Sequence, residues 1–274
     1  MYLAVDIGAT KVLMAVFTND GKLLERTKFP TGESYAKLID DLKTEFKKLK
    51  QQDFQKAVIA VPGLLDRQAG IGIAFGNRPW KNVPIRDDTE QFLNCPVLIE
   101  NDAKLAALSE ALLIINDFKK VLYVTISTGI SAGLIVNGVI DPNLANSESG
   151  HMRLEHNGKL EKWQDFASGR AIVAKYGQRA SEITDKTIWK AIAKDITVGL
   201  IDLIAVIQPE VIILGGGVGA HFDKFEKPLI QELNRYSLPL VPIPPIRMAQ
   251  NPEEAVIYGC YSLAKRAEMH DAIA

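Results

Sequence analysis

The sequence predicts an α/β protein composed of two similar halves. Strand-like and helix-like hydrophobic patterns alternate along its 274 residues. An order of strand, small polar turn, strand and tight turn starts at Val5 and again at Val124, about 119 residues later. The length also suits two domains of ordinary size. We therefore expect an internal duplication with a boundary near Asn116.

The first half begins with a β-rich segment. The alternation and the intervening turns predict strands at Tyr2–Asp6, Lys11–Thr18, Leu23–Phe29, Ala57–Val61 and Pro96–Ile99. Apolar residues at helical spacing predict a helix over about Ser34–Lys50, and an alanine- and leucine-rich helix over Ala103–Ile115.

The second half repeats this order. Strands are expected at Val121–Ser127, Ala132–Val136 and Val211–Leu214. Helices are expected at about Gly169–Glu182, Lys186–Ile207, Phe225–Tyr236 and Pro252–Glu268.

Composition excludes several classes of protein. The net charge of −1 argues against a nucleic-acid partner bound through bulk charge. The two cysteines, Cys95 and Cys260, exclude a disulfide-stapled domain and a multi-cysteine zinc site. The N-terminus lacks a signal-peptide pattern, and the most apolar segments, Ala111–Ile115 and Val198–Ile207, are too short to span a membrane. We expect a cytoplasmic protein without a membrane partner.

Two turns could bind phosphate. The first expected strand ends at Asp6 and is followed by Gly8, Thr10 and Lys11; small residues let a backbone approach phosphate, and Thr and Lys add donors. Thr128 and Gly129 form a similar turn at the equivalent point of the second half. Ordinary hairpin turns are the alternative interpretation.

A glycine-rich segment follows the strand Val211–Leu214. Its sequence from Gly215 to Ala220 includes Gly216 and Gly217 and fits the G-x-G-x-x-A dinucleotide pattern. No strand ending in an acidic residue follows at the required distance, so a Rossmann dehydrogenase ranks last among the functions considered. A glycine strip against a nucleotide and a tight strand-to-helix turn both stay open.

Two polar clusters are candidate catalytic or binding sites. Asn101 and Asp102 precede a helix, where Asp102 is either a helix cap or a general base that accepts a hydroxyl proton. Glu148 and His151 stand three residues apart, close to His156. A metal site is conceivable there, but polar loop residues that bond a polyol substrate are the favoured interpretation.

Taken in order along the chain, these motifs resemble those of the ROK family (repressors, open reading frames and sugar kinases). Asp6–Lys11 is similar to D-x-G-x-T-K, Val61–Gly63 to V-P-G, Asn77–Trp80 to N-L-x-W, Glu100–Ala103 to E-N-D-A, Thr128-Gly129 to part of G-T-G-x-G-G-G, Glu148–His151 to E-x-G-H, and Pro209–Gly217 to P-E-x-x-x-x-G-G-G.

The resemblance implies an actin-like, ribonuclease-H-related fold with ATP and sugar in a cleft between two αβ domains. These would be residues 1–115, joined by a C-terminal helix at about 255–274, and residues 116–254. Asp102 would be the base for the sugar hydroxyl. The implied sugar-binding residues are Gly63, Asn77, Asn101, Asp102, Glu148, His151 and Gln164. The resemblance also implies that ATP carries Mg²⁺ near Asp6. The implied ATP-binding residues are Asp6, Gly8, Thr10, Lys11, Thr128, Gly129, Gly216 and Gly217.

Three departures from the family pattern stand out. The family's zinc loop after the E-x-G-H histidine has no cysteine here, so no zinc is expected. Gln164 takes the place of an acidic sugar-binding residue and can donate as well as accept hydrogen bonds. Ser127, Ser131 and Ala132 replace glycines of the second phosphate loop.

The resemblance predicts an ATP- and Mg²⁺-dependent kinase that phosphorylates a hexose or N-acylhexosamine at its primary hydroxyl. The alternative is a non-catalytic sugar- or nucleotide-sensing protein on the same scaffold. A repressor is disfavoured because no residues precede Met1 to form a DNA-reading domain, and the family habit implies a homodimer.

Overall fold

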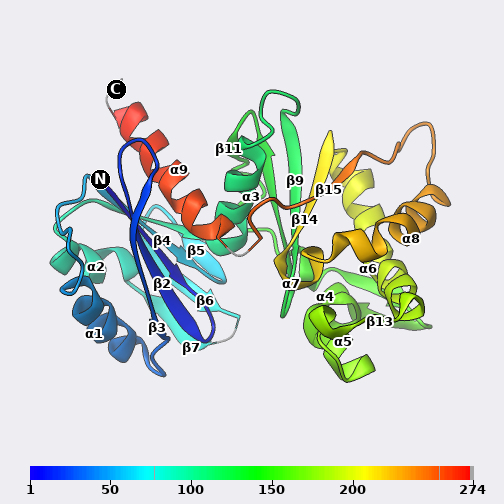
Figure 1. The fold of residues 1–274 in the computed structure, drawn as a ribbon, viewed down its shortest axis with the longest axis horizontal. Coiled ribbons are helices and arrows are strands. Elements are labelled where there is room, and N and C mark those ends of the chain that lie inside the picture. The colour runs from blue at the N-terminus through cyan, green and yellow to red at the C-terminus, as the bar shows by residue number, and fades with distance from the viewer. Residues whose placement is uncertain (77, 253, 272–274) are drawn as a thin grey trace. The chain divides into compact units, whose positions relative to one another are not determined.

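In the computed structural model, the chain forms two compact units (Figure 1). Unit 1 contains Met1–Ser109 and Glu254–Ala274, and unit 2 contains Glu110–Glu253. The structure describes residues 1–76, 78–252 and 254–271. No helix within these ranges is long and apolar enough to cross a membrane. The division falls inside helix α3 (Asp102–Leu112), upstream of the boundary near Asn116 that the repeat suggests.

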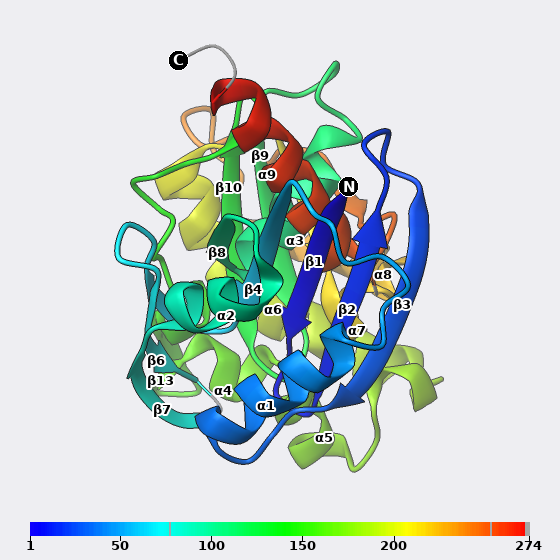
Figure 2. The same cartoon turned by 90° about the vertical axis from the view of Figure 1, so that its left-hand side faces the viewer.

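Unit 1 is organised around a five-stranded mixed sheet in the order β3-β2-β1-β4-β8 (Figure 2). Its strands are β1 (Tyr2–Ile7), β2 (Lys11–Phe17), β3 (Leu23–Pro30), β4 (Lys56–Val61) and β8 (Val97–Asn101). The first three form antiparallel pairs, whereas β4 runs parallel to both β1 and β8. Both parallel neighbours are reached through crossover connections, so β1 and β8 direct their C-terminal ends to one edge.

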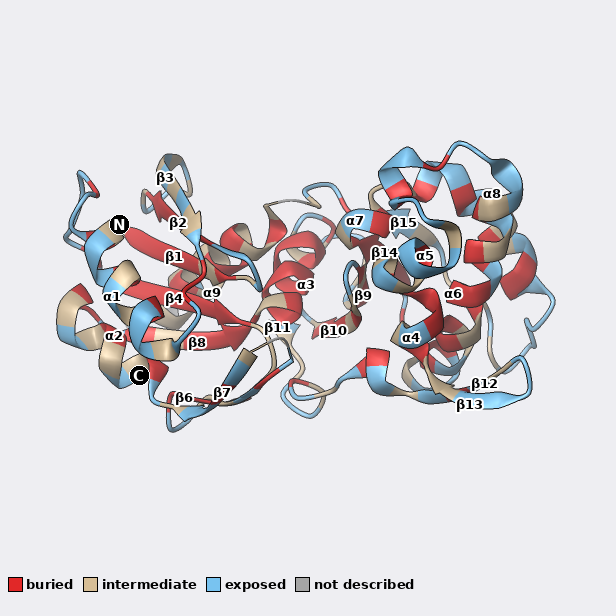
Figure 3. Ribbon diagram, turned by 90° about the horizontal axis from the view of Figure 1, so that it is seen from below, coloured by how far each residue is buried: buried red, intermediate tan, exposed pale blue. Residues whose placement is uncertain are grey.

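Side chains alternate between the two faces of this sheet. One face, with Leu3 and Val5 of β1, packs against α1 (Tyr35–Phe46) and α2 (Ile85–Leu93). The opposite face, with Tyr2 and Ala4, packs against α9 (Ala255–Asp271). Because both faces are covered, β4 is buried over its whole length (Figure 3).

A close contact fixes α9 in unit 1. A Cβ atom on Gly259 of α9 would lie 2.0 Å from the carbonyl oxygen of Leu105 on α3. Phe17 of β2 packs edge-on against Tyr258 at 5.3 Å between ring centroids. The two helices therefore approach each other at a position where only a glycine fits.

The sequence patterns did not anticipate the segment between β4 and β8. It contains α2 and a separate antiparallel sheet of three short strands, β5 (Leu64–Asp66), β6 (Ile71–Phe75) and β7 (Arg78–Val83). The first expected helix is also shorter than predicted: α1 ends at Phe46 instead of continuing to Lys50.

Unit 2 repeats the sheet connectivity of unit 1. The order is β11-β10-β9-β14-β15, with β9 (Lys120–Ile126) antiparallel to β10 (Ile130–Val136) and parallel to β14 (Val211–Gly215). The edge strands are β11 (Val139–Ile140) and β15 (Ile246–Met248). The same hairpin-plus-parallel-strand arrangement in both units is the structural form of the duplication that the sequence predicts.

Helices cover one face of this second sheet. Leu122, Val124 and Ile126 share a buried core with residues of α6 (Lys186–Ile207) and α8 (Phe222–Asn234). The Trp189 ring of α6 stacks on Phe225 of α8, with centroids 5.5 Å apart. This core supports the strand ends from which the turns of the site emerge.

Shorter elements complete unit 2. A hairpin of β12 (Arg153–His156) and β13 (Lys159–Lys162) leads into α4 (Trp163–Ala167) and α5 (Gly169–Tyr176). A single helix over Gly169–Glu182 was expected, and this is wrong. Gly177 adopts a left-handed conformation that caps α5, and a 3₁₀ turn at Ala180–Glu182 follows. The glycine-rich segment forms the short helix α7 (Gly216–Gly219).

Candidate functional site

The first candidate phosphate turn connects β1 to β2. Gly8 donates its backbone N–H to the carbonyl of Lys11 at 3.1 Å, and Thr31 Oγ1 donates to the carbonyl of Gly8 at 2.8 Å. A Cβ atom on Gly8 would lie 2.9 Å from the Lys11 carbonyl, so the turn is too tight for a larger residue. Thr10 and Lys11 are exposed at its tip, where their donors can meet an anion.

Two carboxyl groups interact beside this turn. Asp6 lies near the end of β1, and burial together with the nearby charge of Asp102 raises its pKa to about 7. Burial also raises the pKa of Asp102, while the backbone N–H of Ala103, which donates to Oδ1 at 2.7 Å, opposes that rise. A carboxylate with a raised pKa is a stronger base, which suits proton abstraction from a hydroxyl group.

Asn101 caps α3 and thereby positions Asp102. Its Oδ1 accepts hydrogen bonds from the backbone N–H groups of Ala103 at 3.0 Å and Lys104 at 3.3 Å. Its Nδ2 donates to the carbonyl of Gly63 at 3.2 Å. Gly63 has a φ of +115°, and a Cβ atom there would lie 2.1 Å from the carbonyl oxygen of Ala74. The helix cap that the local sequence favoured for Asp102 therefore comes from Asn101, and Oδ1 of Asp102 adds only the bond from the Ala103 N–H given above.

The strand that carries Asn101 is held by an ion pair that the sequence did not reveal. Arg67 donates from Nε to Oε2 of Glu100 at 2.7 Å and from Nη2 to Oε1 of the same carboxylate. Glu100 is 5% exposed, and a bidentate pair of this kind fixes both side chains.

The expected sugar loop is described only in part. Asn77 lies outside the described residues. Arg78, which replaces the leucine of the family motif, donates to the carbonyls of Ala9 and of Thr31, the latter at 3.4 Å, and its guanidinium lies over the Trp80 ring at 5.5 Å. Arg78 thus connects β7 to the turn between β1 and β2.

The second candidate phosphate turn connects β9 to β10. Ser127 donates its N–H to the carbonyl of Gly129 at 2.8 Å, and its own carbonyl accepts the N–H of Gly169 at 2.7 Å. Gly216, with a φ of +77°, lies against the end of β9. A Cβ atom on Gly216 would lie 2.6 Å from the carbonyl oxygen of Ile126. Glycines therefore bring the start of α5 and the start of α7 directly against this turn.

These elements surround a pocket of about 460 Å³ within unit 2. Thr128 and Gly217, both expected at a nucleotide site, line it. Arg170 and Arg179 line it as well, and no sequence motif pointed to either. This pocket has a threonine hydroxyl, a glycine that leaves its backbone accessible, and two guanidinium groups. Such a set of groups can bind a polyphosphate ligand. The residues that line it are Ser127, Thr128, Gly169, Arg170, Val173, Arg179, Ala180, Ser181, Gly217 and Val218.

The expected sugar-binding residues of unit 2 gather beside the same turn. His151 and Gln164 are in contact, with their Nε2 atoms 3.3 Å apart. A Cβ atom added to Gly129 or to Gly150 would lie 3.0 Å from Oε1 of Gln164. Glu148 is exposed one residue before the 3₁₀ turn Ser149–His151. Gln164, His151 and the second candidate phosphate turn are therefore neighbours, although 35 positions separate Gly129 from Gln164.

Within the described ranges, no three His, Cys, Asp or Glu side chains come together as a set of metal ligands. His156 and His151 are therefore not brought together as metal ligands. The ring nitrogens of His156 instead lie beside the carboxylates of Glu161 and Asp195, at 3.2 and 3.3 Å.

Comparisons with known proteins agree on one family. The sequence model of the ROK family matches residues 2–267. The chain is 26% identical to a glucokinase of Halalkalibacterium halodurans over 88% of this chain and 87% of the relative. It is also 26% identical to an N-acetyl-D-glucosamine kinase of Citrobacter koseri, over 94% of this chain and 97% of the relative.

A solved structure agrees with the fold. The ROK family glucokinase from Streptomyces griseus, in complex with glucose and AMPPNP, superposes with a TM-score of 0.82 at 23% identity, covering 97% of this chain and 99% of that one. This likeness confirms the predicted actin-like ATPase fold. Together with the nearly full-length family match, it shows that the chain belongs to the ROK family.

Proposed function

We propose that this protein transfers the γ-phosphoryl group of ATP to the primary hydroxyl of a hexose or an N-acylhexosamine. The observation that carries the proposal is the pocket of about 460 Å³ in unit 2, lined by Thr128, Gly217 and two arginines. Phosphoryl transfer depends mainly on positioning and on neutralising phosphate charge, and these groups are suited to that task. The family's glucokinase and N-acetyl-D-glucosamine kinase relatives support the choice of substrate class.

The proposed nucleotide contacts come from glycine-containing turns. In unit 2, Thr128, Gly129, Gly216 and Gly217 would lie along ATP, and the guanidinium groups of Arg170 and Arg179 would add charge that the sequence motifs did not predict. In unit 1, the exposed Thr10 and Lys11 would donate to phosphate oxygens, while Gly8 keeps that turn tight.

The proposed general base is Asp102. It follows directly after the Asn101 cap, and burial raises its pKa. As a base it would accept the proton of the sugar hydroxyl as that oxygen attacks the γ-phosphorus, an effect worth about 10²–10⁴-fold in rate. Glu148, His151 and Gln164 would bind the other sugar hydroxyls, together with Gly63 and Asn101 in unit 1.

The donor set fits Mg²⁺ bound to ATP. This ion takes oxygen ligands and is usually held by one or two carboxylates together with substrate phosphates. Asp6, whose charge interacts with that of Asp102, is the carboxylate we assign to it. When bound, Mg²⁺ neutralises phosphate charge. Zinc has no part in the proposal, because the hairpin after His151 contains no cysteine.

An ADP-release assay over a panel of hexoses and hexosamines with Mg²⁺-ATP tests the proposed function. We expect turnover that saturates with at least one sugar. Absence of turnover on every sugar, combined with sugar-dependent thermal stabilisation, would instead establish a non-catalytic sugar sensor on the same fold.

A further inference from the structure

Helix α4 is anchored at its first residue. The backbone N–H of Trp163 donates to the carbonyl of Met152 at 2.9 Å, and the Trp163 side chain is fully buried. A Cβ atom on Gly199 of α6 would lie 2.2 Å from the Trp163 ring, so the indole lies directly against the α6 backbone. This anchor fixes where α4 begins, and the hydrogen bond from the Gly169 N–H to the Ser127 carbonyl holds the chain just beyond its end.

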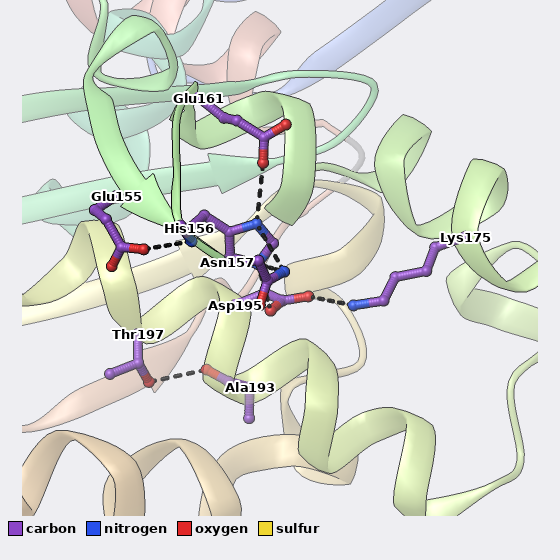
Figure 4. Close-up of polar contacts among 9 residues, drawn as sticks. Glu155, His156, Asn157, Glu161, Lys175, Ala193, Asp195 and Thr197 are labelled. Carbon is purple, nitrogen blue, oxygen red and sulfur yellow. Dashed lines mark hydrogen bonds and ion pairs between the residues drawn. The ribbon is translucent and has the colours of Figure 1, made fainter.

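A cluster of side chains from several elements packs against the residues between these two points. Figure 4 shows its polar contacts, between His156, Glu161, Asp195 and Lys175. The His156 ring at the end of β12 stacks on the Phe166 ring of α4, with centroids 4.0 Å apart and planes 6° apart. Its Nδ1 lies 3.2 Å from Oε2 of Glu161, and its Nε2 lies 3.3 Å from Oδ1 of Asp195 on α6. Lys175 of α5 donates to Oδ2 of Asp195 at 3.0 Å. We call these five residues the His156 cluster.

The cluster is buried enough to be specific. The side chains of His156 and Asp195 are 14% and 12% exposed, so the contact between them is largely removed from water. Contacts between polar groups are stronger in such surroundings than on an open surface. Lys175 and Glu161 lie at the rim, 47% and 41% exposed. The central contacts are therefore those of His156 with Asp195 and with Phe166.

Gln164 lies on the same short helix, between Trp163 and Phe166. Its carboxamide contacts His151 and lies against Gly129 and Gly150, which belong to the second phosphate turn and to the 3₁₀ turn. A rotation of α4 about its anchored first residue would move Gln164 away from all three. Within α4, Phe166 is connected to α6 through the stacked His156 ring and Asp195.

We propose that His156 and Asp195 are positioning residues that hold Gln164 in place for the sugar, so that the His156 cluster determines sugar affinity. The inference rests on the proposed function, because Gln164 is assigned there to the sugar. The cluster acts through Phe166 and α4, and none of its members needs to touch a ligand. The residues we assign to ATP, among them Thr128, Gly217 and the arginines, are not members of the cluster, so the larger effect is expected on the sugar.

Steady-state kinetics of three variants test this inference. His156→Ala removes the stacking and both polar contacts, whereas His156→Phe keeps a flat ring against Phe166 and removes only the polar contacts. Lys159→Ala is the matched control, since Lys159 is exposed and pairs with His156 across the hairpin. We expect His156→Ala to raise the KM for sugar roughly tenfold, with the KM for ATP and kcat changed less than about twofold. His156→Phe should fall between His156→Ala and the wild type, and the control should match the wild type.

A structural measurement accompanies the kinetics. The side-chain amide resonances of Gln164, assigned by NMR, report its contact with His151 whether or not the protein is active. Displaced Gln164 resonances in His156→Ala and His156→Phe, with a raised KM for sugar, support the proposal. Unmoved resonances overturn it, as does an equal loss across kcat and both KM values. A wild-type protein that phosphorylates no sugar would overturn the proposed function alone, and the NMR result would still decide the role of the cluster.

Discussion

The Nδ2 atom of Asn101 donates a hydrogen bond to the backbone carbonyl of Gly63, 38 residues earlier in the chain, at 3.2 Å. The same side chain caps α3 through Oδ1. One amide therefore connects the turn after β4 to the start of the helix that carries Asp102. Since Asn101 is only 4% exposed, water cannot easily replace either partner.

Removing this amide should destabilise the protein. We expect Asn101→Ala to lower the free energy of unfolding by roughly 1–2 kcal/mol, because both the helix cap and the bond to Gly63 are lost. Asn101→Ser retains a good capping residue and should lose less. Urea unfolding of both variants measures the difference. Equal stability of Asn101→Ala and the wild type would show that the cap contributes nothing.

Replacing the proposed base should impair turnover but not binding. Asp102→Asn keeps an oxygen for the Ala103 N–H and removes the basic carboxylate. We expect kcat to fall by about 10²–10⁴-fold while sugar binding, measured by calorimetry, stays within about twofold. Asp87→Asn, which changes an exposed carboxylate on α2, is the control and should retain full activity. Phosphorylation at the wild-type rate by Asp102→Asn would falsify the assignment.

The Asp6 carboxyl makes stability depend on pH. Its pKa is raised from 3.8 to about 7 in the folded protein, so between these values the folded state binds more protons than the unfolded state. The free energy of unfolding should therefore decrease as pH rises from about 4 to about 7 and level off above that range. The raised pKa of Asp102 acts in the same direction.

Asp6→Asn isolates the contribution of Asp6 to this slope. Chemical unfolding at several pH values between about 5 and 8 should give a shallower decrease for the variant than for the wild type, because the remaining slope comes from other groups with shifted pKa values, such as Asp102, Glu110 and His221. Identical slopes for the two proteins would mean that Asp6 does not titrate in this range.

Two neighbouring glycines should respond differently to the same substitution. Gly216 has a φ of +77° and faces the Ile126 carbonyl, so Gly216→Ala should cost about 1–3 kcal/mol of unfolding free energy. A Cβ atom added to Gly217 would meet no heavy atom within 4 Å, and this residue lines the pocket, so Gly217→Ala should fold normally and raise the KM for ATP severalfold. Thermal melts and ATP kinetics separate the two effects. A Gly216→Ala protein as stable as the wild type would contradict the backbone argument.

The sequence predicted the elements whose hydrophobic periodicity is strong. Helix α6 spans the predicted residues Lys186–Ile207, and β1, β2 and β9 lie within about a residue of their expected ends. The segment from β5 to β7 was missed because its strands are short, and register shifts interrupt both of its strand pairs. The single helix expected over Gly169–Glu182 is interrupted at Gly177. The left-handed backbone of this residue ends α5, despite the helical hydrophobic pattern on either side.

The sequence predicted those candidate site residues that lie in short local motifs. The order of residues placed Asp102 after a strand, and the repeat pointed to the turns at Gly8 and Gly129. Arg170 and Arg179 could not be found in this way, because they line the pocket only after α5 packs on the Ser127 carbonyl, 42 residues before Gly169. A basic residue directly after the Ser168-Gly169 pair is the only local signal of that arrangement.

Helix α9, which completes unit 1, is the last helix among the residues that the structure describes. During synthesis, all of unit 2 leaves the ribosome before α9 does, and until then one face of the first sheet lacks this cover. That face presents Tyr2, Ala4 and Phe17, an apolar surface of the kind that chaperones bind and that promotes aggregation. Unit 2 can therefore complete its fold before unit 1 does, and a chain that stops short of α9 keeps this apolar face exposed.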